Sequence, residues 1–187
     1  MSYKKSSDWF DLLKAFVLAL LIAIIIRQFF FSPIIVDGPS MQPTLYDRDQ
    51  MIVNKFIYHL KDPDRFDIII FHASKDKDFI KRVIGLPGEH VMVRDNVLYI
   101  NGEQVEQPFL NQEANEQGQF PIITGDFTLE MLPGGHDVIP ERHVLVLGDN
   151  RSNSTDSRSL GLVHMDEIVG KTDLIYWPLE RIHLVKD

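Results

Sequence analysis

A serine and a lysine stand in settings that could make them a nucleophile and a base. Ser40 lies between Gly38-Pro39 and Pro43. Glycine permits close approach of another chain and the prolines restrict local freedom, so the backbone here is unusual. On its own, this spacing is more typical of a plain turn.

Lys81 lies in a run with the alternation of a β-strand. Since alternate residues of a strand face one side, its neighbours on the same face would be Phe79 and Val83. Burial among apolar side chains would lower the lysine pKa from about 10.4 and make the amine a usable base near neutral pH. An exposed lysine on an edge strand is the alternative interpretation of this run.

Hydroxyls, carboxylates and guanidinium groups are dense between Leu147 and Ser159. Asp156 and Arg158 are spaced to form a charge-assisted pair, and Ser154 could hydrogen-bond a buried amine. A solvated loop would have the same composition, so this stretch by itself leaves both interpretations open.

Taken together, the three stretches resemble the motifs of the type I signal peptidase family in their order and spacing. Gly38–Leu45 is similar to its nucleophile motif, Lys81–Gly88 to its lysine motif and Gly148–Arg158 to its third signature. The similarity covers nearly the whole chain, and the compact size and single N-terminal anchor are similar to the Gram-positive branch.

The resemblance implies a serine protease with a Ser–Lys dyad on an all-β fold. Ser40 would be the nucleophile, and Lys81, neutral at rest, would be the general base. Ser154 would orient the lysine amine, while Asp156 and Arg158 would hold the site together. The resemblance also implies shallow apolar pockets that fit a small-x-small cleavage site, because they exclude larger side chains by size. The residues implied for these pockets are Ile34, Val36, Met41, Leu45, Phe79 and Ile80.

Two positions depart from the family pattern. Gly38 stands where some members carry a second hydroxyl for the oxyanion. The backbone N–H of Ser40, helped by an amide near Gly38, would then do more of that work. Phe66 stands where the family usually has glycine, and we expect it to alter the start of a strand without touching the dyad.

The N-terminal segment predicts a membrane anchor. The run Ala15–Ile26 is wholly apolar, and residues 9–31 as a helix would reach roughly 34 Å, enough to cross a bilayer. Phe31-Ser32-Pro33 follows, and not the small-x-small site of a cleaved signal peptide. A buried core helix is the alternative.

Lysines precede this segment, at positions 4, 5 and 14, against Arg27 at its far end. The positive-inside rule therefore predicts a single-pass protein of the cell membrane with its C-terminal domain outside. The predicted parts are a cytoplasmic N-terminus (1–8), a transmembrane helix (9–31) and an extracytoplasmic catalytic domain (32–187).

Beyond the anchor the sequence predicts a mainly β domain with antiparallel sheets, because short β-type runs alternate with turn signals. The run 97–105 is typical of a hairpin around Asn101-Gly102. Residues 165–169 predict a short helical turn, and 107–119 a polar surface loop. The predicted strands are Ile34–Val36, Gln50–Asn54, Asp67–Phe71, Phe79–Ile84, His90–Arg94, Val97–Ile100, Val144–Leu147 and Lys171–Trp177.

Composition excludes several functions. The chain has no cysteine, and its net charge of −8 gives no basic footprint for nucleic acid. The seven histidines form no helical zinc motif, and we expect neither a metal nor a cofactor. A Ser-His-Asp triad on Ser40 would lack the second glycine of a nucleophile elbow.

The predicted partners are pre-proteins that carry signal peptides, together with membrane lipid, beside the protein export machinery. Two other functions fit parts of the sequence. One is a self-cleaving Ser–Lys regulator, although such proteins are usually soluble and bind DNA. The other is a membrane-tethered β domain that binds exported chains without cutting them. Turnover of a separate precursor distinguishes signal peptide cleavage from both.

Overall fold

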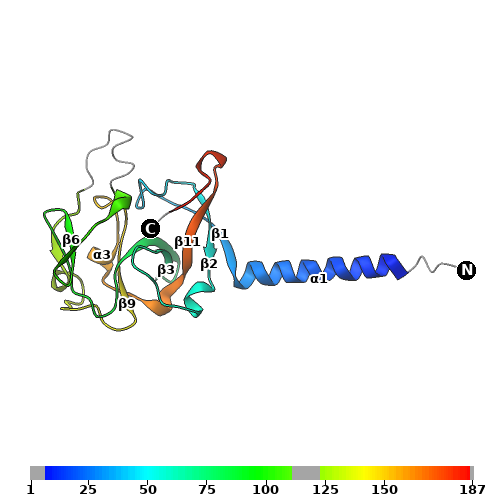
Figure 1. Ribbon diagram of the computed structural model, residues 1–187, viewed down its shortest axis with the longest axis horizontal. Coiled ribbons are helices and arrows are strands. Elements are labelled where there is room, and N and C mark those ends of the chain that lie inside the picture. The colour runs from blue at the N-terminus through cyan, green and yellow to red at the C-terminus, as the bar shows by residue number, and fades with distance from the viewer. Residues whose placement is uncertain (1–6, 111–122, 186–187) are drawn as a thin grey trace, which may run out of the picture.

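The computed structural model describes residues 7–110 and 123–185. A long helix, α1, extends away from a body made of β-strands, and the smaller of two sheets lies at the far end of that body (Figure 1). The predicted surface loop 107–119 lies outside the described residues from position 111 onward.

Helix α1 (Ser7–Phe29) covers most of the predicted anchor. Many of its apolar side chains are exposed, among them Leu12, Phe16 and Ile24, because the helix packs against the domain only near its C-terminal end (Figure 1). Within the part of the chain that the structure describes, no helix combines the length and the hydropathy of a membrane span. The transmembrane assignment therefore stays a prediction.

The larger sheet is antiparallel and has the order β1-β2-β11-β3-β4-β9-β10, with β12 paired to β11. Strand β1 lies at one end of this order and joins directly to α1 (Figure 1). The strands are β1 (Phe31–Ile35), β2 (Gln50–Asn54), β3 (Ile68–Ser74), β4 (Lys77–Gly85), β9 (His143–Leu147), β10 (Val163–His164), β11 (Ile168–Trp177) and β12 (His183–Leu184).

The smaller sheet is also antiparallel and has the order β7-β6-β5-β8. The predicted hairpin is confirmed: Asn101 and Gly102 both have positive φ angles, as a two-residue hairpin turn requires. The strands are β5 (Val91–Arg94), β6 (Val97–Ile100), β7 (Glu103–Val105) and β8 (Phe127–Thr128).

Short helical turns connect the strands. The turn predicted at 165–169 exists as η4 but ends earlier, since strand β11 begins at Ile168. The turns are η1 (Ile57–His59), η2 (Pro108–Leu110), η3 (Leu129–Met131), α3 (Ser157–Leu160), η4 (Met165–Glu167) and η5 (Leu179–Arg181).

Phe66 adopts a φ of 71°, a left-handed conformation that costs little for glycine and is unfavourable for a bulky residue. Packing and hydrogen bonding hold it there. Its ring lies 5.2 Å from that of Phe109, and its carbonyl accepts a hydrogen bond from Arg82 Nη1. Phe66 therefore takes a backbone conformation that glycine would adopt at little cost. Its hydrogen bond is to Arg82, the neighbour of Lys81, and not to Lys81 itself.

Three buried clusters fill the body, and one of them supports the nucleophile. Met41 and Leu45, which follow Ser40, pack with Met51, Ile68 and Ile175 beneath the turn that carries the serine. Because these side chains are almost fully buried, the turn is fixed against the larger sheet from below.

Candidate active site

Ser40 lies in a turn that follows β1 and is fixed from two sides. Gln42 N–H donates to the carbonyl of Pro39 inside the turn, and Leu45 N–H donates to that of Met41. From the third motif, Asn150 N–H donates to the Ser40 carbonyl and Asn150 Nδ2 donates to that of Pro39. The backbone of the serine is thus bonded to the chain more than a hundred residues away.

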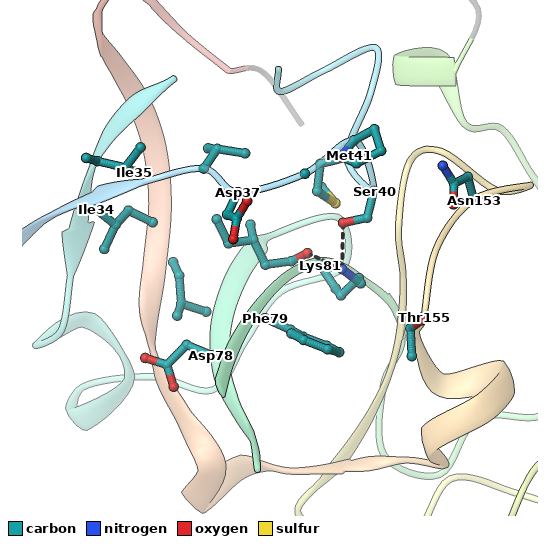
Figure 2. Close-up of a pocket in the computed structure, with 15 residues that line it drawn as sticks. Ile34, Ile35, Asp37, Ser40, Met41, Asp78, Phe79, Lys81, Asn153 and Thr155 are labelled. Carbon is teal, nitrogen blue, oxygen red and sulfur yellow. Dashed lines mark hydrogen bonds between the residues drawn. The ribbon is translucent and has the colours of Figure 1, made fainter. Parts of the chain in front are cut away.

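Lys81 comes from the middle of β4, and its side chain is 3% exposed. Its Nζ lies 2.8 Å from Ser40 Oγ and 2.8 Å from the carbonyl oxygen of Ile80, and the first of these contacts is drawn in Figure 2. The Phe79 ring lies on the same side, with its centroid 5.1 Å from Nζ. The structure therefore joins the two residues that the sequence motifs singled out.

Burial lowers the pKa of Lys81 to about 8, because charging the amine among apolar groups is unfavourable. The carboxylates of Asp156 and Asp149 act in the opposite direction and limit the shift. An amine with this pKa has a substantial neutral fraction slightly above neutral pH, which is the form that can accept a proton from a serine hydroxyl.

The third motif approaches the dyad at Gly148. A Cβ at this position would overlap both Ser154 Oγ and the carbonyl oxygen of Ser40, so only glycine allows the two chains to pack this closely. Ser154 Oγ is buried, and among the described residues it has no hydrogen-bond partner. The expected hydrogen bond from Ser154 to Lys81 is thus not formed in this structure.

Asp156 and Arg158 form the expected ion pair. Arg158 Nε and Nη2 each donate to one carboxylate oxygen of Asp156 at 2.8 Å, and the Gly148 amide donates to the same group. Burial by itself would raise the pKa of Asp156, but these hydrogen bonds outweigh it and hold the pKa below its usual range. Arg158 Nη1 also donates to the Arg151 carbonyl, which fixes the loop that carries Ser154.

A second, fully buried ion pair was missed by sequence reasoning. Arg82 donates to Asp149 through Nε and Nη2, and both side chains are inaccessible to solvent. Thr44 Oγ1 donates to the same carboxylate at 2.6 Å. This group links the segment after Ser40, the residue after Lys81 and the third motif. The available signal was a second charged residue, Arg82, inside the apolar part of the strand that carries Lys81.

A cavity of about 390 Å³ opens beside the dyad, between β1 and β4 (Figure 2). Five of the six residues expected in the substrate pockets line it: Ile34, Val36, Met41, Phe79 and Ile80. Leu45 does not. The bond from its N–H to Met41 turns the chain back, so its side chain is 0% exposed in the core cluster beneath.

Gly38 adopts a φ of 88°, and its N–H donates to Asp47 Oδ1 at 2.9 Å. This amide therefore already has a partner, and it would have to give up that hydrogen bond to assist the oxyanion as expected. The N–H of Ser40 itself is the remaining candidate on this turn.

Both strands beside the cavity present an edge toward it. Among the strands that the structure describes, β1 pairs only with β2, and the segment Lys77–Lys81 of β4 pairs with β3 alone, since β9 joins from Arg82 onward. Unpaired strand edges accept a further extended chain by main-chain hydrogen bonds. The cavity is therefore suited to a peptide in extended form.

One group of potential metal ligands lies outside this site. Ligand atoms of His90, Glu130 and Asp137 come within 4.8 Å of one another, with His90 Nε2 3.4 Å from Glu130 Oε1. Two of the three are exposed, and the residues lie near the smaller sheet. Neither Ser40 nor Lys81 belongs to this group.

Comparison with known families gives a match over most of the chain. The model of a family described as signal peptidase, peptidase S26, matches residues 9–177. Those residues include the turn of Ser40, strand β4 and the third motif, which are the parts that form the site described above.

Individual relatives agree with this match. Signal peptidase I of Bacillus caldolyticus is 46% identical over 158 residues, covering 83% of this chain and 85% of the relative. Signal peptidase I T of Bacillus subtilis (strain 168) is 39% identical over 186 residues, covering 98% and 93%. A crystal structure of a signal peptidase I from Enterococcus faecalis V583 is 42% identical, with a TM-score of 0.53, and the match covers 59% of this chain and 97% of that one.

Proposed function

The chain belongs to the signal peptidase family, peptidase S26, and we propose that Ser40 and Lys81 are the dyad with which it cuts signal peptides from pre-proteins. It is a serine protease of the type I signal peptidases, as its relatives' names indicate. The observation that carries the assignment of the dyad is the 2.8 Å contact between Lys81 Nζ and Ser40 Oγ, with the lysine buried.

In the acylation step the neutral amine of Lys81 takes the proton of the Ser40 hydroxyl, and Oγ bonds to the scissile carbonyl carbon. The negative charge then forms on the carbonyl oxygen, where the Ser40 N–H is the candidate donor. When the C–N bond breaks, Lys81 returns the proton to the leaving amine. The acyl group of the signal peptide stays on Ser40, and the mature protein leaves with a free N-terminus.

In the deacylation step Lys81 is neutral again and accepts a proton from water. The resulting hydroxide equivalent adds to the ester carbon, and collapse of the adduct returns the proton to Ser40 Oγ. One water is consumed and one peptide bond is broken over the cycle. The bonds from Asn150 and the ion pair of Asp156 with Arg158 keep the geometry of the two groups through both steps.

The precursor binds as an extra strand between the edges of β1 and β4. Ile34, Val36 and Met41 meet one side of this strand, and Phe79 and Ile80 meet the other. Their side chains leave room for small residues, so alanine-like side chains on alternate positions of the precursor are favoured over large ones. This explains a small-x-small requirement by size.

Helix α1 anchors the domain at the cell membrane in this proposal, with residues 1–8 in the cytoplasm and the domain from residue 32 outside. Its support is the exposed apolar surface of α1, its extension away from the body in Figure 1 and the lysines that precede it. An anchor places the enzyme and the apolar segment of a precursor in the same thin layer, beside the lipid and the export machinery, which raises their effective concentration. Protease protection of the N-terminus in sealed vesicles tests this topology.

Cleavage of a purified pre-protein in detergent or lipid tests the dyad. We expect the wild type to cut once after a small-x-small site, and we expect Ser40→Ala and Lys81→Ala to be inactive yet folded. Lys77→Ala is the matched control, because Lys77 lies on the same strand but is exposed. Retained cleavage by both dyad variants would refute the assignment, and binding without turnover by the wild type would favour a binding domain.

A further inference from the structure

The cavity contains two carboxylates that the hydrolytic mechanism does not use. Asp37 and Asp78 both line it, and both are exposed. Among the described residues that line the cavity, Lys81 is the only cation, and its amine is directed at Ser40. The remainder of the cavity is apolar or uncharged, so the charge of its walls away from the dyad is negative.

Figure 2 shows how these groups are ordered along the cavity. Ile34 and Asp78 lie toward one end, Asn153 and Thr155 toward the other, and the contact between Ser40 and Lys81 lies between them. Asp78 precedes Lys81 by three residues on β4, which corresponds to roughly 10 Å along a strand. An extended precursor has the same rise, so Asp78 is level with a residue three or four positions from the scissile bond.

The direction of the precursor places that residue before the cleavage site. β1 leads from α1 to the turn of Ser40, so the end of the cavity near Ile34 is the end closer to α1. A precursor held in the membrane by its own apolar segment enters from that end. The residues that precede the small-x-small site therefore pass the two carboxylates.

The two carboxylates differ in the contacts that they make with neighbouring side chains. His72 Nδ1 lies 2.6 Å from Asp78 Oδ1, and both side chains are more than half exposed. No ion pair of the described residues involves Asp37, and the nearby Arg48 is paired with Asp47.

We propose that Asp37 and Asp78 select precursors by charge, favouring lysine or arginine four or five residues before the scissile bond, just ahead of the small-x-small site, and disfavouring glutamate or aspartate there. This inference rests on the proposed function and adds a specificity to it. Since the carboxylates are exposed, each opposite-charge contact changes affinity by no more than about fivefold, and salt reduces the effect.

Three precursors that differ only in the fourth residue before the scissile bond, as lysine, glutamine or glutamate, test the selection. With wild-type enzyme at low salt, we expect kcat/KM to be about fivefold or more higher for lysine than for glutamate, and the ratio to shrink at high salt. Asp37→Asn with Asp78→Asn should bring the ratio close to one. Asp76→Asn should keep it, because Asp76 lies in the turn before β4, outside the cavity lining.

Equal cleavage of the lysine and glutamate precursors by wild type at low salt would overturn the inference and leave the proposed function intact. An unchanged ratio in the double variant would do the same, because the preference would then come from other groups. Failure of wild type to cut the glutamine precursor would instead refute the proposed function, and charge selection with it.

Discussion

Lys81 Nζ lies 2.8 Å from Ser40 Oγ, although the two residues are 41 positions apart in the chain and come from different elements of the domain. The lysine is fixed by a strand paired on both sides of its C-terminal half, and the serine by a turn bonded to Asn150. The contact is therefore a product of the whole larger sheet. Its effects on the pH dependence of cleavage, on the stability of the fold and on the catalytic rate can be measured separately.

The lowered pKa of Lys81 predicts the pH dependence of cleavage. Only the neutral amine accepts the serine proton, so kcat/KM should rise roughly tenfold per pH unit below about 8 and level off above it. Steady-state cleavage of a peptide precursor from pH 6 to 9.5 measures this. The exposed-lysine variant Lys77→Ala should give the same profile, whereas a flat profile for wild type would contradict a lysine base.

The same burial predicts that Lys81 reduces stability. Its pKa is lower in the folded state than in the unfolded chain, so the unfolded chain binds more protons between pH about 8 and about 10.5. Stability from this group should therefore rise with pH across that window and be lowest, and flat, below it. Lys81→Met should stabilise the protein at pH 7 by about 1 to 3 kcal/mol, while abolishing cleavage.

Urea denaturation at pH 7 and pH 10 checks this. Lys77→Met is the control, because it makes the same substitution at an exposed lysine. The gain should be smaller at pH 10, because part of the charge penalty is already absent in the wild type. A Lys81→Met variant less stable than wild type at both pH values would show that the hydrogen bonds to Ile80 and Ser40 outweigh the desolvation of the amine.

The buried pair of Arg82 with Asp149 predicts a large loss of stability when one partner is removed. Asp149→Asn leaves the Arg82 guanidinium buried without a counter-charge, which should cost about 3 to 5 kcal/mol. Asp166→Asn is the control, because its partner Arg142 and Asp166 itself are exposed, and it should cost less than about 1 kcal/mol. Chemical denaturation of both variants gives the comparison, and equal losses would contradict it.

Removing the Ser154 hydroxyl should affect activity without lowering stability. Its Oγ is buried, with no hydrogen-bond partner among the described residues, so Ser154→Ala should leave the free energy of unfolding unchanged or slightly higher. If the hydroxyl orients the Lys81 amine during catalysis, as the sequence motifs imply, kcat should fall and the pH profile should shift. Ser159→Ala, at an exposed position in the α3 turn that follows, is the control. An unchanged kcat and pH profile would remove Ser154 from the site.

The regular strands were the most predictable part of the fold. Gln50–Asn54 and Val97–Ile100 were predicted at their observed bounds, because alternation and an Asn-Gly turn determine them locally. The two-residue strands β8, β10 and β12 were missed, since so short a segment has no period. They form only because longer strands offer partners.

Site residues that belong to a sequence motif were predictable. Residues whose position depends on packing between distant parts of the chain were less so. Ser40, Lys81 and the pair of Asp156 with Arg158 came from motifs and lie together. Leu45 was expected in a substrate pocket, but a local turn directs it into the core. The buried contact of Arg82 with Asp149 joins residues that are 67 positions apart, and no local pattern encodes such a pairing.

Gly148 offers the sharpest test of how the third motif fixes the nucleophile. Gly148→Ala should displace the turn of Ser40, because the added methyl group would overlap the Ser40 carbonyl oxygen and Ser154 Oγ. We expect kcat to fall by about a hundredfold or more, since a displacement near 1 Å is enough for such a loss. Gly125→Ala is the control, because its Cβ would meet nothing within 4 Å. Cleavage kinetics and thermal unfolding of both variants separate misplacement from unfolding. Full activity in a folded Gly148→Ala variant would show that the turn of Ser40 is held without this contact.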